Sequence, residues 1–151
     1  MKYLLGIIFT EIVGIISALM TRGDVQTYTA EIAKPFLSPP PAVFPVAWTL
    51  LYALMGWGAA AVYLSPKSGA RTKGLYLFMF QLAFNFCWSF IFFSFRAFGI
   101  AFAWLAVLLV LVALMFAEFR KVHRLAAYMQ IPYLLWLVFA GYLNLSVWLL
   151  N

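Results

Sequence analysis

Side chains that could bind a ligand recur on one helical face in three apolar segments of the chain. In the segment FQLAFNFCWSFIFF, residues 80–93, the side chains of Gln81, Asn85 and Trp88 are spaced i, i+4 and i+7. Positions at this spacing lie on the same face of an α-helix. Two more stripes of aromatic and polar residues occur in residues 131–150 and 44–56, the first made of Tyr133, Trp136, Ala140 and Asn144, the second of Trp48, Tyr52 and Met55. Three such stripes could line one ligand pocket.

Packing is the alternative explanation for these stripes, and the residues alone leave it open. Aromatic side chains at helical spacing usually fill a core, and a Trp or Tyr near the end of a membrane span usually anchors the helix at the interface. An Asn or Gln inside a span often only bonds to a neighbouring helix. Trp104 and Trp148 lie away from the stripes or near a span end, so we assign them to packing or anchoring.

Conventional catalytic and metal-binding sets do not occur in these segments. The one histidine, His123, lies in the basic stretch RKVHR, where a solvated loop residue is expected. No His, Cys, Asp or Glu cluster has metal-ligand spacing, and neither a Ser/His/Asp set nor a glycine-rich phosphate loop is present. We therefore expect no metal site, no obligatory cofactor and no conventional hydrolase. Glu11 is the only carboxylate in an apolar span, and a helix or subunit contact is favoured for it over a proton relay.

The composition identifies an integral membrane protein. Of 151 residues, 67% are hydrophobic and only 9% are charged, and the mean hydropathy is +1.01, whereas a soluble domain is about half apolar and a quarter charged. Apolar runs close to the roughly 20 residues that cross a bilayer predict five spans, at residues 3–20, 43–64, 75–95, 97–117 and within 125–150. No segment alternates as a transmembrane β-strand does. The expected fold is an all-α bundle of five transmembrane helices in a single domain, residues 1–151.

Basic residues predict the orientation of this bundle. The net charge of +6 does not indicate a nucleic-acid partner, because the basic residues lie between the predicted spans. One side of the membrane would carry seven of them and the other side three, namely Lys2, Lys67, Arg71, Lys73, Arg120, Lys121 and Arg124 against Arg22, Lys34 and Arg96. The positive-inside rule then places the N-terminus in the cytoplasm and the C-terminus outside.

Five prolines occur in KPFLSPPPAVFPVAWTLLY, residues 34–52, just before and inside the start of the second span. Proline fixes φ near −65° and biases its predecessor toward an extended backbone, so residues 39–41 are expected to form a short polyproline II segment. A long, stiff, proline-rich loop between the first two helices could cover a pocket in the bundle, with Tyr28 and Lys34 on it. A rigid connector without a ligand beneath it is the alternative.

Three segments together resemble one known family. KPFLSPPPAVFPVAWTLLY, QLAFNFCWSFIFF and PYLLWLVFAGYLN occur in this order on the predicted spans, and they resemble the TspO/MBR family, the tryptophan-rich sensory proteins of bacteria related to the mitochondrial translocator protein or peripheral benzodiazepine receptor. The resemblance covers almost the whole chain. It implies a five-helix bundle in the lipid bilayer of a bacterial inner membrane, assembled as a homodimer. Small residues four apart at Ala83 and Cys87 are a candidate for the close approach of two helices.

The resemblance also implies a ligand and a set of site residues. Family members bind tetrapyrroles such as protoporphyrin IX and haem, as well as isoquinoline carboxamide and benzodiazepine-type drugs, under the first long loop. Combined with the stripes, this makes the expected ligand-binding residues Tyr28, Lys34, Pro40, Trp48, Tyr52, Gln81, Asn85, Trp88, Trp136, Ala140 and Asn144. Lys34 or backbone donors would meet the porphyrin propionates. One loop aromatic is missing, because the family often has Trp-Tyr where this chain has Thr27-Tyr28.

Three functions follow as hypotheses. The first is a tetrapyrrole-binding receptor or sensor that promotes light-dependent breakdown of its ligand, with Trp48 and Trp136 as the reactive residues, because some members are reported to degrade protoporphyrin IX in light. The second is a transporter of porphyrins or other amphipathic molecules. The third is an interaction protein without ligand turnover. Cholesterol recognition through the family's aliphatic-Tyr-basic motif is not expected, since no basic residue follows Tyr142.

Overall fold

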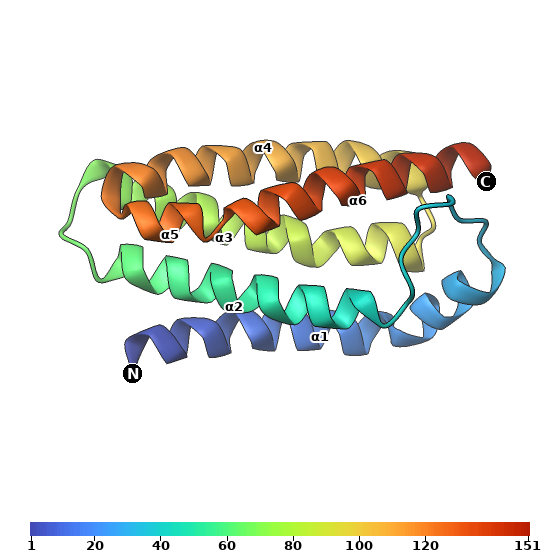
Figure 1. The fold of residues 1–151 in the computed structure, drawn as a ribbon, viewed down its shortest axis with the longest axis horizontal. Helices are drawn as coiled ribbons and strands as arrows, with labels where there is room; N and C mark the ends of the chain where they lie inside the picture. Colours follow the sequence, from blue (N-terminus) through green and yellow to red (C-terminus); the bar gives the residue numbers. More distant parts are fainter.

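The computed structural model describes residues 1–151 as a bundle of antiparallel helices without a β-strand (Figure 1). Its elements are α1 (Lys2–Glu31), α2 (Val43–Tyr63), α3 (Gly69–Ser89), the π-helix η1 (Phe90–Ser94), α4 (Phe98–Val122), α5 (Arg124–Tyr128) and α6 (Ile131–Leu150). Five helical segments, counting α3 with η1 and α5 with α6 as one each, are long and apolar enough to cross a membrane. The predicted all-α membrane fold is confirmed.

The first helix is longer than hydropathy predicts. We expected its span to end at residue 20, but α1 continues to Glu31, and Ile32 is the first residue with an extended backbone, at φ −89° and ψ 133°. Residues 21–31 are more polar but contain no proline, so nothing forces the helix to stop before Pro35. The prediction that Tyr28 lies in the loop is therefore wrong, because this residue lies near the end of α1.

The fifth crossing consists of two helices. α5 ends at Tyr128, and α6 begins at Ile131 with Pro132 in its first turn, where the missing N–H of proline leaves no helical hydrogen bond unmade. The transmembrane part is thus the C-terminal part of residues 125–150. The third crossing also changes geometry, because α3 passes without a break into the π-helix η1.

Close packing of α1 on α2 depends on two glycines. α1 contacts chiefly α2, α3 contacts chiefly α4, and α4 also contacts α6. A Cβ added to Gly6 would collide with the backbone carbonyl of Gly56, and a Cβ added to Gly56 would collide with the carbonyl of Gly6. Next to this crossing, the buried hydroxyl of Thr10 donates to the carbonyl of Tyr52 at 2.6 Å. Small residues thus let two membrane helices approach closely.

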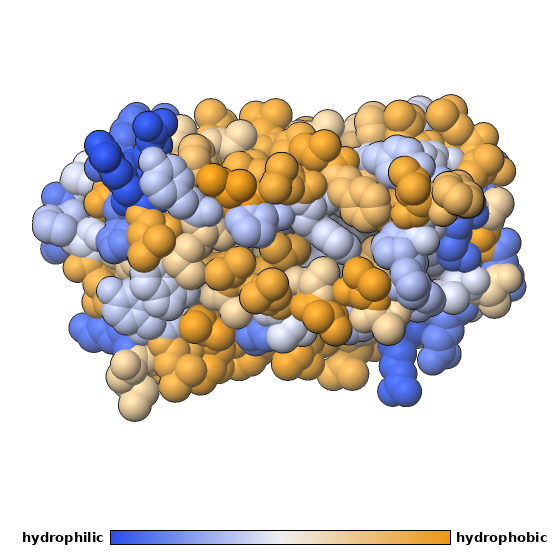
Figure 2. Space-filling view, viewed as in Figure 1, coloured by the Kyte–Doolittle hydropathy of each residue, from blue (hydrophilic) through white to orange (hydrophobic).

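The outer surface of the bundle is suited to lipid. Large apolar side chains are exposed along every long helix, for example Leu19, Val46, Phe80, Val110 and Leu135. In the space-filling view they cover most of the middle of the molecule, while hydrophilic residues gather near its two ends (Figure 2). Such a surface is stable only where lipid tails replace water.

The two ends of the bundle differ in charge. The N-terminus, the connection from Tyr63 to Gly69 and the junction of α4 with α5 lie at one end (Figure 1), which carries Lys2, Lys67, Arg71, Lys73, Arg120, Lys121 and Arg124. We call this the basic end. The opposite end holds residues 32–42, the turn from η1 to α4 and the C-terminus (Figure 1).

Residues 32–42 join α1 to α2 and contain Pro35, Pro39, Pro40 and Pro41. A turn closes where the N–H of Ser38 donates to the carbonyl of Pro35 at 3.1 Å, and the carbonyl of Pro40 accepts from the N–H of Val43 at 3.0 Å. The connection is also tied to the end of α6, since the Asn151 side chain bonds both the N–H and the carbonyl of Ala33. It therefore has anchors on both sides.

Candidate functional site

Four polar side chains from three helices form a continuous hydrogen-bonded chain inside the bundle. The hydroxyl of Tyr52 on α2 donates to Oδ1 of Asn85 on α3 at 2.7 Å, and Nδ2 of Asn85 donates to the hydroxyl oxygen of Tyr133 on α6 at 2.7 Å. Tyr133 in turn donates to Oε1 of Gln81 at 2.8 Å, and Nε2 of Gln81 lies 3.6 Å from the sulfur of Met55. We call these five residues the polar chain.

The polar chain fixes how α2, α3 and α6 meet. Gln81 is completely buried, Tyr133 is 1% exposed and Asn85 is 4% exposed. A polar group without a partner at this depth in a membrane costs several kcal/mol, so each member needs the others in place. Gln81 and Asn85 lie one helical turn apart on α3 and both bond Tyr133. The predicted polar face of the third span therefore points into the bundle.

Tryptophan side chains form an aromatic wall between α2 and α6. The ring centroid of Trp48 lies 5.5 Å from that of Tyr52 and 6.2 Å from that of Trp136, the two indoles meeting edge to face at 80°. Trp48 also meets Tyr133 at 6.3 Å, and Phe44 meets Trp136 at 5.9 Å. Edge-to-face contacts at these separations are favourable. The aromatic stripes predicted for the second and fifth spans therefore face each other.

A small cavity of about 10 Å³ lies where the three stripes converge. It is lined by Trp48, Asn85, Trp88, Leu105, Leu108, Leu137 and Ala140. This volume is about what one water molecule needs. The structure therefore brings the predicted residues Trp48, Asn85, Trp88 and Ala140 to one cavity, but in this conformation the cavity is closed to any larger molecule.

Trp88 of α3 and Asn144 of α6 link their helices to the start of α4. The indole N–H of Trp88 donates to Oδ1 of Asn144 at 3.2 Å, and Nδ2 of Asn144 donates to the carbonyl of Phe98 at 2.8 Å. The Trp88 ring stacks on Phe92 of η1, with centroids 4.9 Å apart and planes 22° apart. Asn144 is thus occupied by helix-to-helix contacts.

The predicted residues at the proline-rich end do not line the cavity. Tyr28 packs against Phe92 and Phe93, with ring centroids 5.3 and 5.1 Å away. The ammonium of Lys34 donates to the carbonyls of Thr29 and Ile32 and lies 5.1 Å above the Tyr28 ring. Pro40 is exposed, and its carbonyl accepts from the N–H of Val43 at the start of α2. Tyr28 and Lys34 therefore pack together at the end of the bundle, next to η1.

Glu11 and His123 lie away from the cavity. Glu11 Oε1 on α1 is buried and has no hydrogen-bond partner in the chain. The His123 ring is not a free loop side chain, because its Nδ1 accepts from the N–H of Ala126 at 3.2 Å and the ring lies edge to face with Trp57, with centroids 5.9 Å apart. The histidine therefore caps α5 at the basic end.

Sequence reasoning missed part of the cavity and the centre of the polar chain. Leu105 and Leu108 of α4 line the cavity, but a leucine in the most apolar span carries no signal that separates a pocket wall from lipid contact. Tyr133 lies in a predicted stripe but is not among the expected ligand-binding residues, although it bonds both α3 amides. Its spacing from Trp136 was the available signal.

Comparison with known proteins gives a consistent result. The model of the TspO/MBR family matches residues 6–149. The chain is 34% identical to the tryptophan-rich protein TspO of Archaeoglobus fulgidus over all of this chain and 97% of that protein. It is 35% identical to the translocator protein of Bos taurus, over 89% of this chain and 81% of that protein. It is 36% identical to the tryptophan-rich sensory protein of Cereibacter sphaeroides, over 78% of this chain and 73% of that protein.

Proposed function

The chain belongs to the TspO/MBR family, and from this membership we propose that it is a membrane receptor or sensor for tetrapyrroles. The proposed ligands are protoporphyrin IX and haem, with isoquinoline and benzodiazepine-type compounds as further ligands of the same site. The site lies between α2, α3 and α6. The resemblance of the sequence motifs and the names of the relatives support this assignment.

One observation carries the proposal. Trp48 and Trp136 meet edge to face on two different helices, and Trp48, but not Trp136, lines the cavity together with Trp88 and Asn85. Indole faces stack favourably on a large flat aromatic ring system. Asn85 Nδ2 donates only one hydrogen bond within the protein, so its second N–H is left for a polar atom of a ligand.

Binding must open the cavity. A pocket for a drug-sized molecule measures about 300 Å³ or more, whereas this cavity measures about 10 Å³. Trp48 and Trp136 are only half-buried, so they can rotate outward while the buried polar chain stays intact beneath them. A ligand that binds only the open arrangement shifts the population toward it, which is how occupancy would become a signal for a sensor.

The same residues support photochemistry better than acid–base catalysis. The cavity lining holds no carboxylate, histidine or lysine, so no proton donor or acceptor of the usual kind faces a ligand there. An excited porphyrin beside Trp48 or Trp136 can take one electron from the indole, which leaves an indole radical cation and a porphyrin radical anion. Loss of the ligand in light would start from this electron transfer.

We further propose a homodimer in a bacterial inner membrane with the basic end in the cytoplasm. Ala83 and Cys87 are exposed on the outer face of α3, where a second copy could approach closely. The charge difference between the two ends supports the orientation. Crosslinking of cysteines placed along this face of α3 tests the dimer, and the absence of any crosslinked product would exclude this face.

The test of the ligand site is a titration with protoporphyrin IX in the dark followed by illumination. We expect saturable binding to the wild type and light-dependent loss of the porphyrin absorbance band. Trp48→Phe combined with Trp136→Phe should slow that loss, because phenylalanine is a much poorer electron donor than tryptophan. Trp148→Phe is the matched control, since this indole is 48% exposed and does not line the cavity. Absence of saturable binding to the wild type would refute the proposal.

A further inference from the structure

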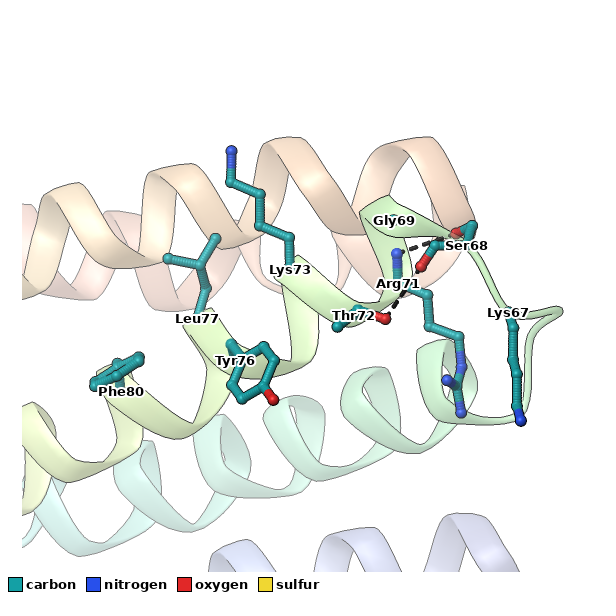
Figure 3. A pocket seen from close by; sticks show the side chains of 9 residues that line it. All are labelled: Lys67, Ser68, Gly69, Arg71, Thr72, Lys73, Tyr76, Leu77 and Phe80. Carbon is teal, nitrogen blue, oxygen red and sulfur yellow. Dashed lines mark hydrogen bonds between the residues drawn. The ribbon is translucent and has the colours of Figure 1, made fainter.

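A broad groove lies on the surface at the basic end, far along α3 from the aromatic cavity. It is shallow and widely open, has a volume of about 930 Å³ and is lined by Lys67, Ser68, Gly69, Arg71, Thr72, Lys73, Tyr76, Leu77 and Phe80. The side chains come from the connection after α2 and from the first three turns of α3 (Figure 3). The tetrapyrrole site does not use any of them.

The outer part of the groove is positively charged. Lys67 makes no hydrogen bond or ion pair and is exposed. The guanidinium of Arg71 is held at the rim, because its Nε and Nη2 donate to the carbonyl of Tyr63 at 3.1 and 2.7 Å. The Lys73 ammonium lies 3.5 Å from Glu118, but that carboxylate is already bonded to Lys121 at 3.1 Å. No carboxylate lines the groove itself.

The inner part of the groove is apolar and continues onto the lipid-facing surface. Tyr76 and Phe80 lie one helical turn apart on α3 and are 65% and 59% exposed. In the close-up, Tyr76, Leu77 and Phe80 follow one another along α3 away from Lys67 and Arg71, and Lys73 points to the other side of the helix beside Leu77 (Figure 3). The basic side chains thus lie near the membrane surface, and the aromatic rings of Tyr76 and Phe80 lie on the side of the hydrocarbon. This order of groups matches an amphipathic molecule with an anionic head.

We propose that this groove binds one anionic phospholipid. The lipid headgroup lies at the charged end of the groove, with Lys67 and Arg71 on one side of α3 and Lys73 on the other (Figure 3), and an acyl chain runs over Tyr76, Leu77 and Phe80. Clusters of Lys and Arg at the end of a membrane helix attract anionic lipid with about 1 kcal/mol per basic residue. Lys67 and Lys73 keep long flexible stems that can follow a headgroup, while Arg71 offers a fixed charge.

A second copy of the chain is a poorer occupant of the groove. In a twofold contact the same patch faces itself, so Lys67, Arg71 and Lys73 would oppose their own copies without a carboxylate between them. The exposed small residues Ala83 and Cys87 lie farther along α3, so a dimer through them would leave the charged end of the helix free. Charge therefore favours lipid over protein here.

The experiment is native mass spectrometry of the full-length protein released from detergent micelles. The protein is titrated with phosphatidylglycerol or with phosphatidylcholine of the same acyl chains, and bound lipid is counted. We expect the wild type to retain one phosphatidylglycerol in preference to phosphatidylcholine. The double variant Lys67→Gln, Lys73→Gln should lose about 25-fold of this preference, about fivefold for each lysine. Arg71 is left intact because it caps the end of α2.

A matched variant removes the same charge elsewhere at the basic end. Arg120 and Arg124 are exposed and make no ion pair, so Arg120→Gln with Arg124→Gln should keep the preference within about twofold. An equal loss in this control would overturn the site, because the whole end would then act as one diffuse charge. An unchanged preference in the lysine variant would also overturn the lipid site. Lipid bound only to monomers and never to dimers would overturn it as well, because the groove would then be occupied by a second copy in the dimer.

Discussion

At the scale of single residues, Asn85 takes part in both the polar chain and the lining of the cavity. It accepts from Tyr52, donates to Tyr133 and also lines the aromatic cavity. Gln81 also contacts both α2 and α6, but Asn85 is the one member of the polar chain that lines the cavity. One side chain therefore couples the stability of the bundle to the state of the cavity.

The variant Asn85→Leu tests this coupling. It keeps the branched shape of the side chain but leaves the Tyr52 hydroxyl without an acceptor, so the free energy of unfolding should fall by about 1 to 3 kcal/mol. The measurement is unfolding in mixed micelles by titration with a denaturing detergent. Tyr52→Phe should then cost less in the Asn85→Leu background than in the wild type, because the hydrogen bond is already absent. Strictly additive losses would show that the two side chains do not cooperate.

Lys34 has contacts within the protein that its expected role in ligand binding does not include. From the sequence, Lys34 is expected to pair with a carboxylate of the ligand. In the structure its ammonium donates to the carbonyls of Thr29 and Ile32 and lies over the Tyr28 ring. A cation at a helix C-terminus stabilises the last carbonyls. This role could not be read from the sequence, because hydropathy ended the helix before Tyr28.

We expect Lys34→Gln to loosen the end of α1 without weakening porphyrin binding more than about twofold, since the ammonium is already engaged by the helix. Amide hydrogen exchange should become faster in residues 28–32 and stay unchanged in α3. Affinity for protoporphyrin IX is measured on the same samples. A tenfold or larger loss of affinity with unchanged exchange would restore the ligand-binding role to Lys34.

At the scale of helices, the contact of α1 with α2 depends on the absence of side chains. Gly56→Ala would put a methyl group against the carbonyl of Gly6, so the helices must separate, and we expect a loss of about 1 to 3 kcal/mol of stability. Gly23→Ala, in α1, meets nothing within 4 Å. It should stabilise the protein by about 0.5 to 1 kcal/mol, because alanine is the better helix former.

These two substitutions are compared by the same detergent titration. They change the same residue type in the same way, so only the neighbours differ. Opposite signs would establish that Gly56 is required by contact with α1. If Gly56→Ala were neutral or stabilising, the close crossing of α1 and α2 would not be the native arrangement.

The elements differ in how far the sequence predicts them. Hydropathy located all five crossings because a helix in lipid must be apolar for about 20 residues. It misplaced the C-terminal end of α1, since the helix continues through polar residues that do not break it. The stripes correctly placed Trp48, Asn85, Trp88 and Ala140 around one cavity. Helical periodicity could not reveal the leucines of α4, nor show that the cavity is nearly closed.

At the scale of the whole molecule, charge asymmetry predicts the orientation in the membrane. The basic end carries Lys67, whereas the opposite end exposes Phe36 almost completely, at 99%. Both positions are accessible to a labelling reagent if it reaches their side of the membrane. A single cysteine at either one therefore reports which end faces the outside.

The measurement labels Lys67→Cys or Phe36→Cys, each in a Cys87→Ala background, with a membrane-impermeant maleimide on intact cells. Because basic loops stay in the cytoplasm, the cysteine at position 36 should react at once, and the cysteine at position 67 only after the membrane is opened. The Cys87→Ala protein alone should not react. The reverse pattern would place the proline-rich connection in the cytoplasm, and the aromatic cavity beneath it would then receive its ligand from the opposite side of the membrane.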